Sequence, residues 1–173
     1  MISPPPPNFT EAGSVQWAKL SLSPPDFLRA APRKQRGRKL LGIRYEDLVQ
    51  KHFCSEFPLY SPAPWLRFRG SSGIKWCQPD GLLFNFAEGV ITIVEIKMTH
   101  TSDSWWQMRK LYQPVLAAIY PQTLWQFRTL EVVRWYDFCT AYPEPTRLLG
   151  NPLDSHHLPL GMTGIHIYKP KKE

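Results

Sequence analysis

The chain has 173 residues, 43% of them hydrophobic, with a net charge of +7 and a pI near 9.5. This length suits one domain that can bury roughly 70% of its unfolded surface. The three cysteines form no CxxC pair, which argues against a disulfide framework or a four-cysteine zinc site. The same cysteine usage favours a reducing intracellular location, cytoplasmic or nucleoid-associated. The first residues are neither basic nor a long apolar run, so we expect no signal peptide and no membrane span. The basic balance favours an anionic partner, and nucleic acid is the first candidate.

Residues 1–37 are predicted to form a proline-rich N-terminal arm. The run of prolines at residues 4–7 favours a polyproline conformation, and later prolines interrupt any helix. Apolar side chains in the arm favour burial against the domain: Trp17, Leu20, Leu22 and Phe27. We therefore expect the arm to lie ordered on the domain.

A basic run joins the arm to the rest of the chain. Its members are Arg33, Lys34, Arg36, Arg38 and Lys39. Such a run is either solvated surface or a set of phosphate contacts. The overall positive charge favours contacts with the phosphates of DNA.

Between about Arg38 and Cys54 the apolar residues recur at helical spacing. They gather on one side of a 3.6-residue wheel: Leu41, Tyr45, Leu48, Val49, His52 and Phe53. Glu46 falls at the edge of this stripe, and Asp47 falls on the solvent side. From the edge of a helix a carboxylate can reach a neighbouring sheet. An exposed glutamate on the rim is the alternative.

The stretch from Pro79 to Lys97 is predicted to form a β-hairpin with its turn near Glu88-Gly89. The second arm places apolar side chains on both faces. One face carries Val90, Thr92, Val94 and Ile96, and the other carries Ile91, Ile93, Glu95 and Lys97. Two apolar faces are typical of a central strand that is covered on both sides. A carboxylate and an amine near the end of such a strand are costly unless they are paired or bind a metal.

The remaining elements complete a mixed α/β pattern. We expect a strand at 65–69, a helix at 104–119 that kinks or breaks near Leu111 because of Pro114, and strands at 130–136 and 164–168. This order predicts a mixed central sheet with helices on both faces, the strand at 130–136 running parallel to the strand that carries Glu95. The core would span residues 38–140. Residues 141–173 would form a loop-rich C-terminal extension packed on the same domain.

Asp80 and Glu95 are candidate ligands of a hard divalent cation. Magnesium prefers oxygen ligands, usually one or two carboxylates with waters and phosphate oxygens. The carbonyl of Ile96 would add a third ligand, and Lys97 would hold the attacking water or steady charge on the phosphate. Such a site would hydrolyse phosphodiesters with Mg²⁺, for which Mn²⁺ would substitute. A structural Asp–Lys–Glu ion-pair cluster is the alternative.

Pro79-Asp80, fourteen intervening residues and Glu95-Ile96-Lys97 together resemble the signature of the PD-(D/E)xK nuclease superfamily. The resemblance covers about residues 38–136. It implies a restriction-endonuclease-like αβββαβ core, a metal site completed by Glu46, and a Mg²⁺-dependent deoxyribonuclease. The expected activity is that of an endonuclease acting in recombination, repair or a mobile element. A catalytically inactive DNA-binding or assembly subunit, a DNA exonuclease and an enzyme or binder directed at RNA remain alternatives.

Other residues bear on the substrate. Gln107 and Lys110 share a helix face and would approach the scissile phosphate, unless both are simply solvent-exposed. Gln107 and Tyr112 are one residue out of step with the Gln/Tyr pair of exonuclease-like members. The run from Arg67 to Gly73 is similar to that of Holliday-junction resolvases, which are small dimers. Possible partners are therefore a second copy or a targeting protein. The histidines, including His100, His156, His157 and His166, are expected on the surface.

Overall fold

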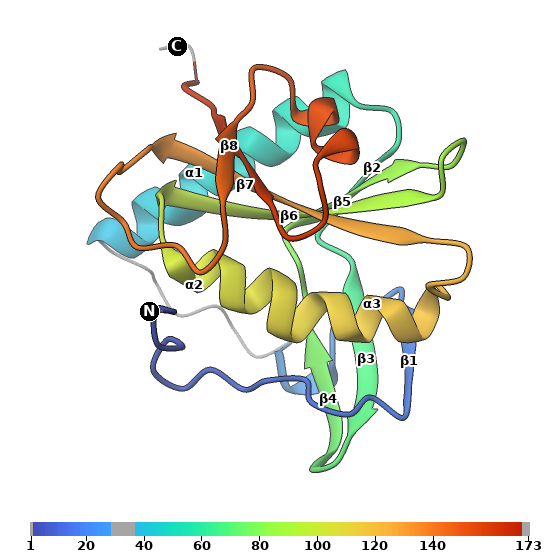
Figure 1. Ribbon diagram of the computed structural model, residues 1–173. Coiled ribbons are helices and arrows are strands. Elements are labelled where there is room, and N and C mark those ends of the chain that lie inside the picture. Colours follow the sequence, from blue (N-terminus) through green and yellow to red (C-terminus); the bar gives the residue numbers. More distant parts are fainter. Residues whose placement is uncertain (1, 29–36, 171–173) are drawn as a thin grey trace.

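The computed structural model describes residues 2–28 and 37–170, and in it the chain forms two β-sheets covered by helices (Figure 1). The helical segments are η1 (Asp26–Leu28), α1 (Gly37–Glu56), α2 (Ser102–Trp105), the π-helical η2 (Trp106–Tyr112), α3 (Gln113–Ile119) and η3 (Pro152–His157). The strands are β1 (Trp17–Ser21), β2 (Tyr60–Pro62), β3 (Trp65–Gly70), β4 (Gly73–Cys77), β5 (Gly81–Asn85), β6 (Val90–Thr99), β7 (Gln126–Trp135), β8 (Thr146–Leu148) and β9 (Thr163–Ile167).

The larger sheet is mixed and has six strands in the order β2-β5-β6-β7-β9-β8. Strand β6 pairs antiparallel with β5 and parallel with β7, so the predicted hairpin and the predicted parallel neighbour are both confirmed. Strands β3 and β4 do not join this sheet as the αβββαβ order suggested. They pair with β1 from the N-terminal arm in a separate three-stranded sheet. The fold is therefore mixed α/β with a mixed central sheet, as expected, and with a second, smaller sheet.

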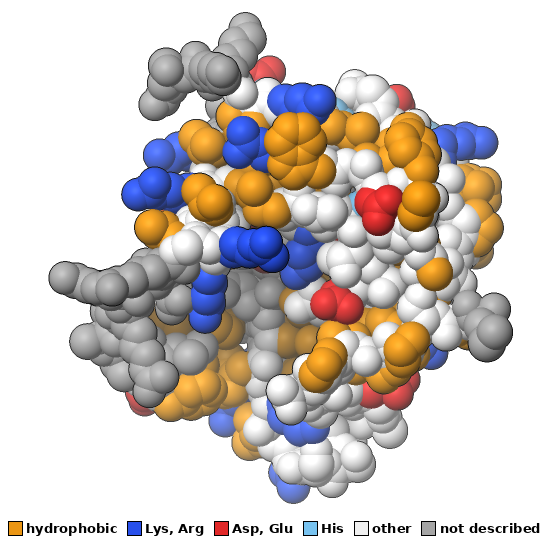
Figure 2. Space-filling model, turned by 90° about the vertical axis from the view of Figure 1, so that its left-hand side faces the viewer, with side chains coloured by type: hydrophobic (Ala, Val, Ile, Leu, Met, Phe, Trp, Pro, Cys, Tyr) orange, Lys and Arg blue, Asp and Glu red, His pale blue; other side chains and the backbone are white. Residues whose placement is uncertain are grey.

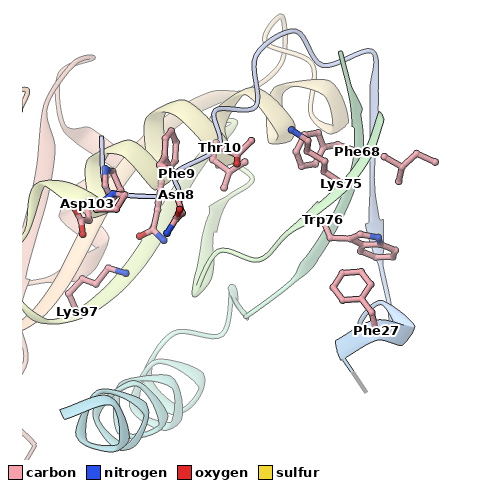
Figure 3. Close-up of a pocket in the computed structure, with 14 residues that line it drawn as sticks. Asn8, Phe9, Thr10, Phe27, Phe68, Lys75, Trp76, Lys97 and Asp103 are labelled. Atoms are coloured by element: carbon pink, nitrogen blue, oxygen red, sulfur yellow. The ribbon is translucent and has the colours of Figure 1, made fainter. Parts of the chain in front are cut away.

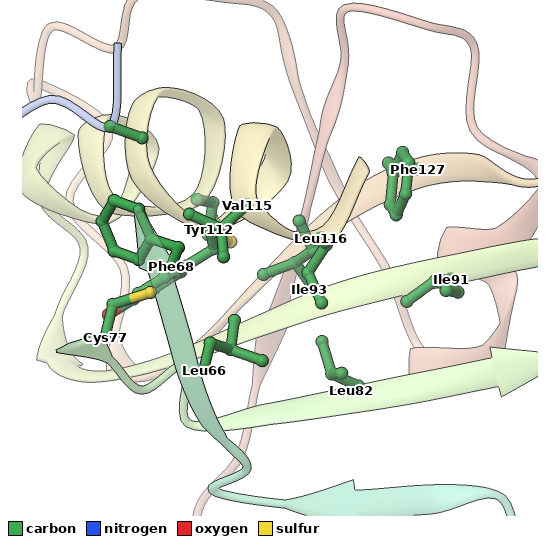
Figure 4. Packing of buried hydrophobic residues seen from close by; sticks show 12 residues of the cluster. Leu66, Phe68, Cys77, Leu82, Ile91, Ile93, Tyr112, Val115, Leu116 and Phe127 are labelled. Atoms are coloured by element: carbon green, nitrogen blue, oxygen red, sulfur yellow. The ribbon is translucent and has the colours of Figure 1, made fainter. Parts of the chain in front are cut away.

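Helices cover both faces of β6, as the alternation of its side chains predicted. Val94 and Ile96 pack against α1 in one apolar cluster, together with Tyr45, Val49 and Phe53. Ile91 and Ile93 lie in a second apolar cluster on the opposite face, which includes Met108 and Val115. These two residues come from η2 and α3, which together with α2 form the second long helix. Figure 4 shows that this second cluster also takes in Leu66 and Phe68 from β3. One helix therefore joins the two sheets through a common core.

The apolar stripe of α1 is narrower than its sequence suggested. Tyr45, Val49 and Phe53 are buried, at intervals of four residues. Leu41 and Leu48, which were predicted in the same stripe, are 51% and 39% exposed. A helix lying on one sheet buries one row of side chains, and residues beside that row remain at its margin.

The second long helix changes its winding in the middle. The α-helical turns of α2 and α3 flank η2, and the Gln113 N–H bonds to the Met108 carbonyl five residues back. Pro114 follows directly and has no N–H to offer the Lys110 carbonyl four residues before it. The Ala12 N–H donates to that carbonyl instead, at 3.0 Å. The expected disturbance near Leu111 is therefore a π-helical segment, and the Lys110 carbonyl within it anchors the N-terminal arm through Ala12.

The described part of the arm, residues 2–28, is held on the domain for a different reason from the one predicted. Leu22 and Phe27 are largely exposed, and Trp17 and Leu20 are exposed by 36% and 46%, so their expected burial is wrong. Backbone pairing of β1 with β3 and the buried side chain of Ala12 hold the arm instead.

The C-terminal segment contributes two strands to the central sheet, one of them at the position expected for residues 164–168. Strand β9 pairs in parallel with β7, and β8 pairs with β9. The prediction of surface histidines is wrong for His100 and His156, which are both buried and bonded to Glu131 and Thr92. Within the described ranges, no helix is long and apolar enough to span a bilayer.

The hairpin turn depends on Gly89, which has a φ of +62°, and a Cβ there would lie 2.4 Å from the Leu124 carbonyl oxygen. We expect Gly89→Ala to lower the free energy of unfolding by roughly 1–3 kcal/mol because it adds both backbone strain and a clash. Gly42→Ala is the matched control: it lies within α1 with no atom near its added Cβ, and should stabilise by about 0.5–1 kcal/mol. Urea denaturation of both variants measures the contrast, and equal stability would contradict the turn geometry.

Candidate active site

Asp80 lies where β5 and β6 stop pairing. The last paired residues are Gly81 and Val94, and the residue that would come opposite Ile96 is Pro79, where the chain has already left the sheet. The Ile96 N–H would therefore lack a strand partner. The Asp80 carboxylate accepts this hydrogen bond through Oδ2 at 2.6 Å. In a strand the N–H and C=O of one residue point to the same side, so the Ile96 carbonyl also faces the end of β5.

Glu95 and Lys97 extend from the same face of β6. The Lys97 Nζ donates to Glu95 Oε1 at 2.7 Å. Glu95 is only 2% exposed, whereas the Lys97 side chain is 27% exposed. The second carboxylate oxygen of Glu95, Oε2, is buried and has no hydrogen-bond partner within the described residues. Native proteins rarely leave such an atom unpaired, because its lost hydration is not replaced.

Glu46 on α1 is electrostatically coupled to these two carboxylates. The pKa of Glu46 is raised to about 7, chiefly by burial and then by the charge of Asp80, with Lys97 opposing. The pKa of Glu95 is raised to about 8, again chiefly by burial, with Asp80 and Glu46 adding to the shift and Lys97 reducing it. Burial also raises the pKa of Asp80, although the Ile96 N–H opposes it. Each carboxyl group therefore resists ionisation, and for Glu46 and Glu95 the neighbouring carboxylates add to the effect of burial.

Lys97 keeps its proton in this setting. Burial alone would lower the pKa of Lys97, but the Glu95 and Asp80 carboxylates outweigh it and the net pKa is raised. Lys97 is thus a positive charge held beside three carboxyl groups.

Two residues that the sequence did not single out fix the backbone at Asp80. Gln50 on α1 donates to the Asp80 carbonyl oxygen. The Tyr60 hydroxyl lies 2.6 Å from Gln50 Oε1 and 3.1 Å from the same carbonyl. Gly81 makes this contact possible, since a Cβ there would lie 2.2 Å from the Tyr60 ring. The only signal for Gln50 in the sequence is its position one helical turn after Glu46.

A buried Glu131–His100 pair holds the chain just after the site. Glu131 lies beside Glu95 in the parallel register of β6 and β7. Its carboxylate accepts from the Thr101 N–H at 3.1 Å and lies 2.5 Å from His100 Nδ1. His100 stacks near Tyr136 and Tyr142, with ring centroids 4.8 and 5.0 Å away. The pair therefore fixes the passage from β6 into α2, whose N-cap is Thr101.

The oxygen donors at this site are of the kind that a divalent cation needs. In residues 2–28 and 37–170, no three acidic, histidine or cysteine side chains already stand arranged around a metal position. Magnesium nevertheless needs only one or two carboxylates, the rest of its shell being water and substrate oxygens. Asp80, Glu95 with its unpaired oxygen, and the Ile96 carbonyl provide oxygen donors of this kind. The residues therefore fit such a cation, with Glu46 as the further carboxylate nearby.

The structure places some of the predicted nucleic-acid contacts near Lys97 and others away from it. Gln107 lines a cavity that Lys97 also lines, so these two residues are brought together. Lys110 is not among the lining residues, and its amine lies 3.9 Å from Glu11 and 5.9 Å from the Trp105 ring centroid. Arg38 and Lys39 are exposed on the first turn of α1. The other members of the basic run, Arg33, Lys34 and Arg36, lie outside the described residues.

The end of the sheet that carries the site has a mixed surface. Figure 1 shows that β6 and β7 both run toward the same side of the molecule, and Figure 2 views that side. Lys and Arg side chains are spread over much of this face, and Asp and Glu side chains are fewer. This surface suits an approaching polyanion.

The raised pKa of Glu95 gives a testable dependence of stability on pH. Between its ordinary value of 4.5 and about 8, the folded protein keeps a proton that the unfolded chain releases. Raising the pH through this window should therefore lower the free energy of unfolding, provided that divalent ions are chelated. In Glu95→Gln the loss between pH 5.5 and pH 8 should shrink by on the order of 1–3 kcal/mol.

Urea denaturation in EDTA measures this difference. Glu56→Gln, which removes an exposed carboxylate at the end of α1, is the matched control and should keep the wild-type dependence. Identical pH dependence in the wild type and Glu95→Gln would show that Glu95 is not buried as described.

Comparisons with protein-family models, curated proteins and solved structures gave no match to this chain.

Proposed function

We propose that this chain is a metal-dependent nuclease that hydrolyses phosphodiester bonds of DNA. The observation that carries the proposal is the buried Glu95 carboxylate, whose Oε2 has no partner among the described residues. A buried carboxylate oxygen beside two other carboxyl groups is a destabilising arrangement unless a cation completes it. Functional sites are where such arrangements are retained.

The charge balance argues against a purely structural ion-pair cluster. The cluster contains three carboxyl groups, Glu46, Asp80 and Glu95, against the single amine of Lys97, and the pKa values of Glu46 and Glu95 are raised in part by the neighbouring carboxylates. A structural cluster gains stability only when its charges are balanced and its polar atoms are bonded. A divalent cation would supply both the balancing charge and a partner for the unpaired oxygen.

The roles of the residues follow from their positions. Asp80, Glu95 and the Ile96 carbonyl would hold Mg²⁺ or Mn²⁺, with Glu46 as the additional carboxylate. When bound, the cation would lower the pKa of a water molecule and offset the negative charge of the transition state. Lys97 keeps its proton and is partly exposed, so its amine can donate to a phosphate oxygen or to the attacking water. Gln50 and Tyr60 hold the Asp80 backbone, and thereby its carboxylate, in place.

The resemblance to PD-(D/E)xK nucleases supports DNA as the substrate and a restriction-endonuclease-like arrangement of α1, β5, β6, the second long helix and β7. The residues that carry the signature lie together where β5 begins and β6 approaches its end. Glu46 lies on α1, the helix that covers the face of β6 on which Ile96 lies. We propose an endonuclease that would act in recombination, repair or a mobile element, as a homodimer or with a targeting protein.

Cleavage assays with conservative variants test the proposed site. Asp80→Asn and Lys97→Met keep side-chain volume, and each should lower the metal-dependent cleavage rate at least about 100-fold. The first removes a charge that would hold the cation, and the second removes the amine that would act on the phosphate or the attacking water. The wild type and variants should be titrated with Mg²⁺ and Mn²⁺ on supercoiled, linear, single-stranded and branched DNA, with RNA in parallel.

Asp47→Asn is the matched control, since Asp47 is an exposed carboxylate next to Glu46 on the same helix. It should retain wild-type activity. Full activity in Asp80→Asn would refute the site assignment. Wild-type protein that binds DNA but cuts none of these substrates would favour the catalytically inactive DNA-binding subunit.

The basic run should contribute to DNA affinity through counterion release. Replacing Arg33, Lys34, Arg36, Arg38 and Lys39 by Gln should reduce the slope of log affinity against log salt by about 0.7–0.9 for each DNA phosphate that the variant no longer neutralises. Fluorescence anisotropy of labelled DNA in EDTA, over a range of salt concentrations, measures the slope. An unchanged slope would assign the run to solvated surface.

A further inference from the structure

A cavity of about 600 Å³ adjoins the candidate active site. Its walls come from segments far apart in sequence: residues 6–10 of the arm, Phe27, strand β4 and the helix turn that carries Gln107 and Leu111. Lys97 lines the same cavity. In Figure 3, Lys97 and Asp103 lie on one side of it, and Trp76 and Phe27 lie on the other. A volume of this size falls within the range of about 300–1,000 Å³ that small-molecule sites occupy.

The lining combines three kinds of groups that together suit a nucleotide. Aromatic rings of Phe27 and Trp76 offer flat faces for stacking. Side-chain amides of Asn8 and Gln107 can each donate and accept hydrogen bonds at the edge of a base. The ammonium groups of the lining, Lys75 and Lys97, outnumber its single carboxylate, Asp103, and supply positive charge for phosphate. An apolar peptide or lipid chain would leave the amides and ammonium groups without partners.

Two details show how these groups are prepared for a ligand. The Oε1 atom of Gln107 is buried and has no hydrogen-bond partner among the described residues. The Arg67 guanidinium lies over the Trp76 ring at 5.6 Å, and the Trp17 ring lies 5.8 Å from the same guanidinium. Trp76 on β4 is therefore packed against Arg67 on the neighbouring strand β3 while it also lines the cavity.

We propose that this cavity receives an unpaired base of the DNA strand that is cut, next to the phosphate at Lys97. The inference rests on the proposed nuclease function and adds the class of substrate. In an intact duplex each base is stacked and paired, so its faces and edges are not available to Phe27, Trp76 and Gln107. Single-stranded, branched or mismatched DNA presents a free base without the unstacking penalty. The enzyme should therefore prefer such DNA to intact duplex.

The test is an equilibrium binding measurement without metal. The probe is a single-stranded DNA of about 12 nucleotides that carries one 2-aminopurine, whose fluorescence falls on stacking. A matched strand has an abasic site at the same position. A series of such pairs places the 2-aminopurine or the abasic site at successive positions along the strand. In EDTA, the wild-type protein should quench the 2-aminopurine fluorescence at one position of the series. The strand with an abasic site at that position should bind roughly 5- to 100-fold more weakly than the 2-aminopurine strand.

Phe27→Ala tests the pocket without threatening the fold, since this side chain is 69% exposed. It should weaken binding of the 2-aminopurine strand by a similar factor and leave binding of the abasic strand unchanged, because the contact is already absent. Trp76→Ala should behave in the same way. Phe86→Ala is the matched control: it is 61% exposed, at the turn of the hairpin far along the strands from Lys97, and should change neither affinity.

Equal affinity for the 2-aminopurine strand and the abasic strand at every position would overturn the inference. So would a Phe27→Ala variant that weakens the binding of both strands equally. The same preparations are assayed for Mg²⁺-dependent cleavage, which separates this inference from the proposed function. Cleavage with no base-dependent binding would refute the pocket and leave the nuclease assignment standing. Base-dependent binding without cleavage of any substrate would retain the pocket and refute the nuclease assignment.

Discussion

The hydrogen bond from the Ile96 N–H to the Asp80 carboxylate is the contact on which the candidate site depends. It forms because β5 begins only at Gly81, opposite Val94, while β6 continues past that point alongside β7. An unpaired N–H on a covered strand requires an acceptor. A side chain takes the place of the absent strand, and this brings one carboxylate next to the strand that carries the other. The break in pairing is thus what creates the site.

The surrounding structure stabilises an arrangement that is unfavourable by itself. Burial and the crowding of three carboxyl groups raise the pKa values of Glu46 and Glu95. The Glu95 oxygen that finds no partner among the described residues adds to the destabilisation. Apolar clusters on both faces of β6 compensate, and Gln50 and Tyr60 prevent the Asp80 backbone from relaxing away. Rigid support of this kind keeps charged groups at fixed separations before a substrate arrives.

The N-terminal arm is connected to the site by a backbone defect in the second long helix. Because Pro114 has no N–H, the Lys110 carbonyl can accept from Ala12, and the arm is anchored on the helix at that point. The preceding residues of the arm then form one wall of the cavity beside Lys97. A hydrogen bond from the Trp106 indole to the Ser3 carbonyl adds a second attachment. The proline in the helix therefore has a structural consequence well beyond a local change of winding.

The sequence by itself determined the local features that have a short-range cause. The alternation of β6, the turn at Gly89, the helix before the hairpin and the grouping of Asp80, Glu95 and Lys97 all follow from side-chain periodicity and turn preference within one or two elements. It also placed Glu46 at the edge of α1, where burial and the charge of Asp80 raise its pKa to about 7. The nuclease chemistry remains a proposal, because it rests on the character of these groups and on a resemblance.

Tertiary structure alone decided the features that depend on pairing between distant segments. Strands β3 and β4 joined the arm rather than the central sheet, because edge pairing is chosen by which backbone is within reach and not by the pattern of either strand. His100 and His156 became buried because Glu131 and Thr92 lie opposite them, and no spacing in the sequence reveals such partners. Leu41 and Leu48 stayed exposed because the neighbour covers only one row of α1. The cavity is the clearest case, since its walls meet only when the arm, β4 and the second helix are packed together.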